Sequence, residues 1–291
     1  MRMPREIAAG VLLLVTAASA QVAPTAELEQ LYLDPAARGS LLVGNGRTLK
    51  GGTFRVSAAL QYTQGHLKSG GSTLLRDRFA LHLLGAVGLT HWLELSGDLP
   101  VVVHQRSDSG AFAPSAAGLS TPFIHARIAI LGEGAPVSLW TSLGLGLPVG
   151  SAGALGAGGL AFAPRINLGR NFERVQLGAE LGALIRGLGS FAEVRGQSVS
   201  AVPRGDRVGS QLSLSIAASQ IGEGLRGEAS VRAFASLSGT PPGLELLFGG
   251  RYPLGEVELF FLGGPGLGGT PTTPTFRLYA GAAFGNGGPP P

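Results

Sequence analysis

The chain has 291 residues, of which 14% are charged, 44% are hydrophobic and 48 are glycine. A soluble domain usually carries about 25% charged residues, and an average composition would give this chain about 20 glycines, so a soluble cytosolic enzyme is disfavoured. The lack of cysteine excludes disulfides, thiolate metal sites and cysteine nucleophiles, and a net charge of +4 without a basic cluster argues against a nucleic-acid partner.

The first 20 residues have the three parts of a secretory signal peptide. Arg2 and Arg5 precede an uncharged apolar run over residues 7–20, which ends in an Ala-Ser-Ala motif. A positive start, a short apolar stretch and a site of this kind are typical of a cleaved leader. The run of about 14 residues is also shorter than the roughly 20 needed to span a bilayer. We therefore predict cleavage after Ala20 and export from the cytoplasm.

Residues 21–52 separate the predicted leader from the first predicted strand. The stretch from Ala26 to Gly52 does not alternate in the way the following segments do. It either leads in from the periplasm or folds into the interior of the barrel predicted below, and the sequence leaves both possibilities open.

Twelve segments within residues 53–284 alternate apolar and polar residues, which predicts strands with one apolar and one polar face. In the first segment the apolar side chains from Phe54 to Tyr62 share one face. Away from the ends of the segments, the charged residues fall on the polar face. The predicted strands lie near residues 53–63, 76–87, 93–103, 122–131, 137–147, 160–169, 175–186, 210–218, 225–235, 244–252, 256–263 and 275–284.

The uncharged run over residues 135–164 is long enough for a membrane helix but has the wrong composition. It contains seven glycines and three prolines. Each interior glycine costs a helix about 1 kcal/mol and each interior proline about 3 kcal/mol. The run therefore predicts a strand, a small-residue loop and a second strand, and any membrane crossing by the mature chain must use strands.

Alternation alone fits a soluble β-sandwich as well as a transmembrane barrel with its apolar face toward lipid. Sparse charge favours the barrel, and so does loop length, because loops after even-numbered strands are short and those after odd-numbered strands are mostly long. Aromatic residues also gather at the two ends of the outward face, as in membrane barrels: Phe54, Tyr252 and Phe284 at one end, and Tyr62, Phe79, Phe162 and Phe276 at the other.

The predicted fold is therefore all-β: an up-and-down antiparallel transmembrane barrel of about 12 strands over residues 53–284, with both termini periplasmic. Residues 285–291 form a predicted flexible Gly/Pro tail. A secreted β-sandwich is the alternative fold.

Three strings of residues carry a family resemblance: GLTHWLELSGDLPVV (88–102), LYLDPAARGSLLVGNG (31–46) and RYPLGEVELFFLGGPGLGGTPTTPTFRLYAGAAF (251–284). They resemble the N-terminal barrel half of OmpA-family outer-membrane proteins of myxobacteria, over most of residues 27–284. The first string is also similar to barrels of the MetA-type phenol-degradation family, which are proposed solute channels. The OmpA resemblance implies an outer-membrane barrel. Because no Asp-rich repeat follows Phe284, we do not expect the peptidoglycan-binding domain that full-length members carry.

The polar phase of the strands predicts a lumen lined by interleaved cations and anions. Such charges either pair across the barrel and seal it, or line a narrow water path with an excess of cations. The predicted lumen-lining residues are Arg55, Arg78, His82, Glu94, Asp98, Arg127, Arg165, Glu180, Arg186, Arg226, Glu228, Arg232, Glu245, Arg251, Glu258 and Arg277.

Neither catalysis nor a cofactor is predicted. The glycine-rich strings lack the Gly-Lys-Ser/Thr of a phosphate cradle, the five histidines show no metal-ligand spacing, and no residue is identified as a nucleophile. The sequence favours a non-catalytic structural protein of the bacterial outer membrane, in contact with its lipid and inserted by the barrel-assembly machinery. The alternative is a narrow pore or transporter for small anionic or hydrophobic solutes.

Overall fold

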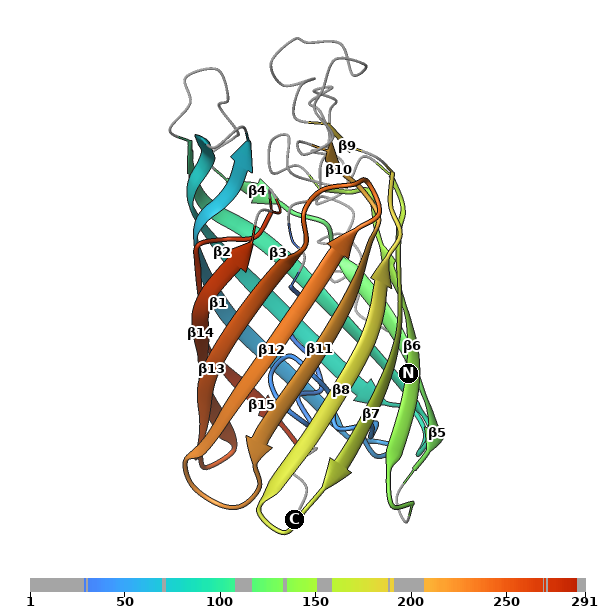
Figure 1. Cartoon of the computed structure of the whole chain (residues 1–291). Coiled ribbons are helices and arrows are strands. Elements are labelled where there is room, and N and C mark those ends of the chain that lie inside the picture. Colours follow the sequence, from blue (N-terminus) through green and yellow to red (C-terminus); the bar gives the residue numbers. More distant parts are fainter. Residues whose placement is uncertain are drawn as a thin grey trace, which may run out of the picture.

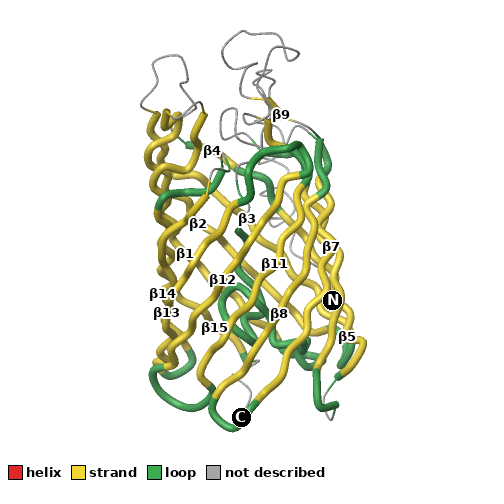
Figure 2. Tube along the Cα trace, in the orientation of Figure 1, coloured by secondary structure: helices red, strands yellow, loops and turns green. Residues whose placement is uncertain are grey.

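The computed structural model describes residue 29 and residues 31–69, 72–107, 117–132, 135–150, 159–187, 189–190, 207–268, 270 and 272–286. Over these residues the chain forms a closed antiparallel barrel of twelve long strands (Figures 1 and 2). The predicted all-β barrel of about twelve strands is therefore confirmed, and a sandwich is excluded because one sheet closes on itself. The predicted leader of residues 1–20 and the tail from residue 287 lie outside the described residues.

Each barrel strand pairs with its neighbours in the chain, and the first pairs with the last to close the ring. The barrel strands are β1 (Phe54–Ser69), β2 (Ser72–Gly88), β3 (Leu93–Ser107), β5 (Phe123–Leu131), β6 (Ser138–Gly146), β7 (Ala161–Asn171), β8 (Val175–Leu184), β11 (Gln211–Gln220), β12 (Arg226–Ser236), β13 (Gly243–Leu254), β14 (Val257–Gly268) and β15 (Phe276–Gly285). Three two-residue strands lie in the connections: β4 (Gly118–Leu119), β9 (Gly189–Ser190) and β10 (Arg207–Val208).

The two ends of the barrel differ in their connections. The turns after β2, β5, β7, β11 and β13 are short and lie at the lower end in Figure 1. The strands β3, β6 and β8 end at the upper end, and the stretches of sequence that follow them before the next long strand are long. We call these the short-turn end and the long-loop end.

The first hairpin differs from the prediction. Residues 64–75 were expected to form a loop, but β1 and β2 continue through most of this stretch. Gly65 has a φ of 61°, and the strand register shifts between Gln64 and Leu67. Gly65 therefore belongs to a β-bulge, which bends the strand without ending it.

The outward face of the barrel is apolar. Leu60, Ile124 and Leu181 are each more than half exposed, and they belong to a large set of exposed aliphatic and aromatic side chains. Aromatic rings meet in pairs on neighbouring strands, with Tyr62 and Phe79 4.8 Å apart between ring centroids. An exposed apolar surface of this extent is stable in lipid rather than in water. No helix in the described part of the chain is long and apolar enough to cross a membrane.

Candidate functional site

The interior of the barrel is occupied by residues 31–50 together with Glu29, which we call the lumen segment (Figures 1 and 2). It has no regular secondary structure, yet every residue from 31 to 46 is buried. At the short-turn end, the Leu49 amide donates a 2.8 Å hydrogen bond to Glu94, near the start of β3. In the long-loop half, Glu29 pairs with Arg277 of β15 at 2.7 Å. Of the two locations that the sequence left open, this stretch occupies the lumen.

Apolar side chains hold the middle of the segment. Leu31, Leu33, Leu41, Leu42 and Val43 share one buried cluster with inward-facing wall residues, among them Leu84, Leu247, Phe260, Leu262 and Tyr279. Burying one leucine side chain contributes about 1.5–3 kcal/mol. Several such side chains make the segment a stable occupant of the lumen.

Two wall glycines allow the segment to approach the sheet closely. A side chain at Gly169 of β7 would collide with the backbone of Asn45, and one at Gly178 of β8 would collide with the Gly44 carbonyl. The polypeptide backbone of the segment therefore rests directly on the backbone of the wall at these two positions.

Two wall arginines are each held by one carboxylate from the wall and one from the segment. Arg127 lies 3.0 Å from Glu94 of β3 and 2.7 Å from Asp34 of the segment. Arg277 lies 3.1 Å from Glu245 of β13, in addition to its contact with Glu29. The segment therefore supplies part of the counter-charge that these buried guanidinium groups require.

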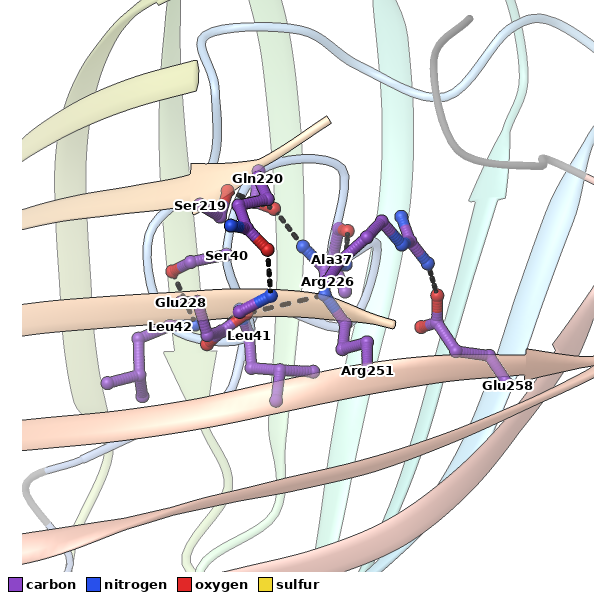
Figure 3. A network of polar contacts seen from close by, with 12 residues as sticks. Ala37, Ser40, Leu41, Leu42, Ser219, Gln220, Arg226, Glu228, Arg251 and Glu258 are labelled. Atoms are coloured by element: carbon purple, nitrogen blue, oxygen red, sulfur yellow. Dashed lines mark hydrogen bonds and ion pairs between the residues drawn. The ribbon is translucent and has the colours of Figure 1, made fainter. Parts of the chain in front are cut away.

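A third wall arginine binds the backbone of the segment with its side chain, as Figure 3 shows. Arg251 donates hydrogen bonds to the carbonyls of Ala37, at 2.8 Å, and Gly39. Its Nε lies 3.3 Å from Glu228, whose carboxylate also accepts the Leu41 amide at 3.0 Å. Arg251 and Glu228 thus fix a bend of the segment from both sides.

His82 connects the wall to the end of the segment. Its Nδ1 lies 3.0 Å from an Asp98 carboxylate oxygen and its Nε2 lies 2.7 Å from Gln61 Oε1, while the Gln61 amide donates to Glu29 at 3.1 Å. Both ring nitrogens therefore face oxygen atoms, and the imidazole connects the Asp98 carboxylate to the Gln61 side chain.

Twelve of the sixteen predicted lumen-lining residues are buried, and Arg55, Arg165, Arg186 and Arg232 are half-buried. Some pair within the wall, as Arg55 and Arg226 do with Glu258. Arg186 lies beyond the end of β8 and donates to the Gly209 carbonyl at 3.0 Å. The described residues contain no group of three or more side chains suited to hold a metal.

The sequence did not predict two kinds of polar residue that hold the lumen segment: uncharged side chains of the wall, and acidic side chains of the segment itself. Gln176 donates to the Gly39 carbonyl at 2.6 Å, and Gln61 orients Glu29. Glu29 and Asp34 lie on the segment, outside the alternating strands from which the lumen-lining residues were predicted. A signal did exist, because Leu84, Leu247 and Leu262 are large apolar residues on the polar phase of their strands. Such residues indicate an apolar occupant of the lumen.

Replacing Glu94 by glutamine is expected to lower the free energy of unfolding by about 3 kcal/mol, because breaking a buried ion pair leaves Arg127 with less counter-charge. The midpoint of urea unfolding in detergent, followed by heat-modifiable gel mobility, measures this loss. Glu173→Gln, in the exposed turn between β7 and β8, is the matched control and should change stability by less than about 0.5 kcal/mol. Equal effects of the two variants would contradict the role given to Glu94.

Comparison with known proteins finds outer-membrane barrels. An outer-membrane channel from Pseudomonas putida F1 aligns with a TM-score of 0.60 and 14% identity, covering 83% of this chain and 98% of that one. The KdgM porin aligns with a TM-score of 0.51 and 8% identity, covering 79% and 98%. At these identities the likeness shows the fold alone. No family model and no curated protein matches the chain, so the OmpA resemblance remains a prediction.

Proposed function

We propose that the protein is a narrow outer-membrane pore for small anionic solutes. This corresponds to the alternative that the sequence allowed, and it replaces the purely structural role that the sequence favoured. The fold shared with an outer-membrane channel and a porin supports the proposal.

The observation that carries the proposal is the way the lumen is filled. Pairing within the wall does not complete the charge balance of the lumen, since Arg127 and Arg277 each take a second carboxylate, Asp34 and Glu29, from the segment. The predicted lining contains nine arginines against six carboxylates, and the segment adds Glu29 and Asp34 together with Arg38 and Arg47, so the cation excess persists. A constricted path with excess cations favours anions over the hydrophobic solutes that the sequence also allowed.

The apolar outward face and the short-turn end support a proposed orientation of the barrel in the outer membrane. We place the short turns in the periplasm and the long loops outside the cell, as in bacterial outer-membrane barrels. We also propose that the leader over residues 1–20 directs export, that the barrel contacts outer-membrane lipid, and that the barrel-assembly machinery inserts it.

Planar-bilayer recording of the purified full chain tests the pore. We expect small, discrete conductance steps and, across a potassium chloride gradient, a reversal potential that shows chloride preference. The same preparation after heat denaturation is the control and should give none. A barrel that shows folded, heat-modifiable mobility but no steps would instead have a structural role.

A further inference from the structure

The lumen segment does not fill the barrel evenly. A cavity remains between Leu31, Tyr32 and Leu42 of the segment and the wall formed by β7, β8, β11 and β12. The volume open to the centre of a water-sized sphere is about 20 Å³. A cavity needs about 10–15 Å³ by this measure to hold one water, so the gap admits one occupant of that size.

The side chains of the wall explain the position of this gap. On the β13 and β14 side, Leu247, Phe260 and Leu262 pack against the segment. On the β7 to β12 side the cavity is lined by small residues, including Ala163, Gly182, Ser213 and Ser215. The segment therefore packs against the bulky side chains of β13 and β14, and at the level of this cavity it leaves a gap beside the small residues of β7, β8 and β11.

The charges that line this cavity do not cancel. Its lining contains two cations, Arg165 and Arg232, and one anion, Glu180. Arg165 lies 3.6 Å from Glu180. Within the described part of the chain, Arg232 has no carboxylate within ion-pair distance, because its cross-strand neighbour Glu245 pairs with Arg277. The Arg232 guanidinium lies 5.8 Å from the centroid of the Phe234 ring and, within the described residues, lines the free space without a salt bridge.

This arrangement differs from the arginines that hold the segment. Arg127, Arg251 and Arg277 are buried and are engaged by carboxylates or carbonyls. Arg165 and Arg232 are half-buried, and both line the cavity. The hydroxyls of Ser213 and Ser215 lie in the same lining and supply further donors.

We propose that Arg165 and Arg232 bind a permeating small monovalent anion in this gap between the lumen segment and strands β7 to β12. This inference rests on the proposed pore function and assigns its selectivity to two residues. Arg165 contributes a guanidinium shared with Glu180, and Arg232 contributes one that forms no salt bridge within the described residues.

Reversal potentials in a potassium chloride gradient test the assignment, with chloride as the probe. The double variant Arg165→Gln/Arg232→Gln should lower the chloride-over-potassium permeability ratio about fivefold, the equivalent of about 1 kcal/mol for unit charges near 4 Å in water-like surroundings. The double lysine variant keeps both charges and should keep most of the preference. Arg174→Gln removes a charge from the exposed turn between β7 and β8 and should have no effect.

The outcomes separate the two proposals. A double glutamine variant that conducts with an unchanged ratio overturns the assignment to Arg165 and Arg232 and leaves the pore function standing. A folded wild-type barrel without conductance overturns both. If the double variant does not fold, Arg232→Gln alone decides, because no ion pair of Arg232 is lost, and an unchanged ratio in that variant would likewise overturn the assignment.

Discussion

Deletion of residues 29–48 should convert the proposed narrow pore into a wide one. These residues include every buried residue of the lumen segment except Leu49, and the twelve wall strands close on each other without them. Water would replace the segment between the polar faces of the strands, so single-channel conductance should rise several-fold. Planar-bilayer recording measures the change.

The controls for this deletion address folding and location. Heat-modifiable gel mobility shows whether the shortened chain still forms a barrel. Lys50→Gln, an exposed residue at the end of the segment, should conduct like the wild type. A folded deletion variant with wild-type conductance would show that another part of the chain, and not residues 29–48, limits the pore.

Valine at Gly169 should displace the segment without removing any of its residues. The added side chain would collide with the Asn45 backbone, and β7 cannot retreat because it is paired with β6 and β8. Overpacking of this kind costs about 1–3 kcal/mol, so the segment should leave its docked position up to about a hundredfold more often.

The wild-type chain contains no cysteine, which makes this displacement easy to measure. A cysteine introduced at the buried Ser40 should react faster with a membrane-impermeant maleimide when Gly169→Val is also present. Gly85→Val on β2 is the control, since a side chain there meets no other atom within 4 Å. If Gly169→Val leaves the labelling rate at the control value, the segment does not depend on this contact.

The strands and the direction of their faces were predictable because alternation is a local property of the sequence. Each strand shows its own period of two, and the charges of β8 and β12 keep to the polar phase without reference to any partner. The first hairpin was predicted too short because a glycine looks the same in a loop and in a bulge.

The lumen segment could not be placed from the sequence because its partners are distributed over the whole barrel. Asp34 pairs with Arg127, while Glu29 pairs with Arg277, 248 positions away. Neither contact leaves a periodic trace in residues 31–50. The glycine excess likewise had a purpose that composition did not reveal, since Gly169 and Gly178 are where the segment rests on the wall.

The contact between Glu29 and Arg277 also bears on the order of folding. The ring closes when β1 pairs with β15, a contact between the two ends of the barrel sequence such as Arg55 with Gly285, and pairing over this separation is slow. The segment directly precedes β1 in the chain and binds β15 through Arg277. It therefore holds the last strand near the first. We expect the barrel to close around the segment, so that the segment does not have to enter a barrel that has already closed.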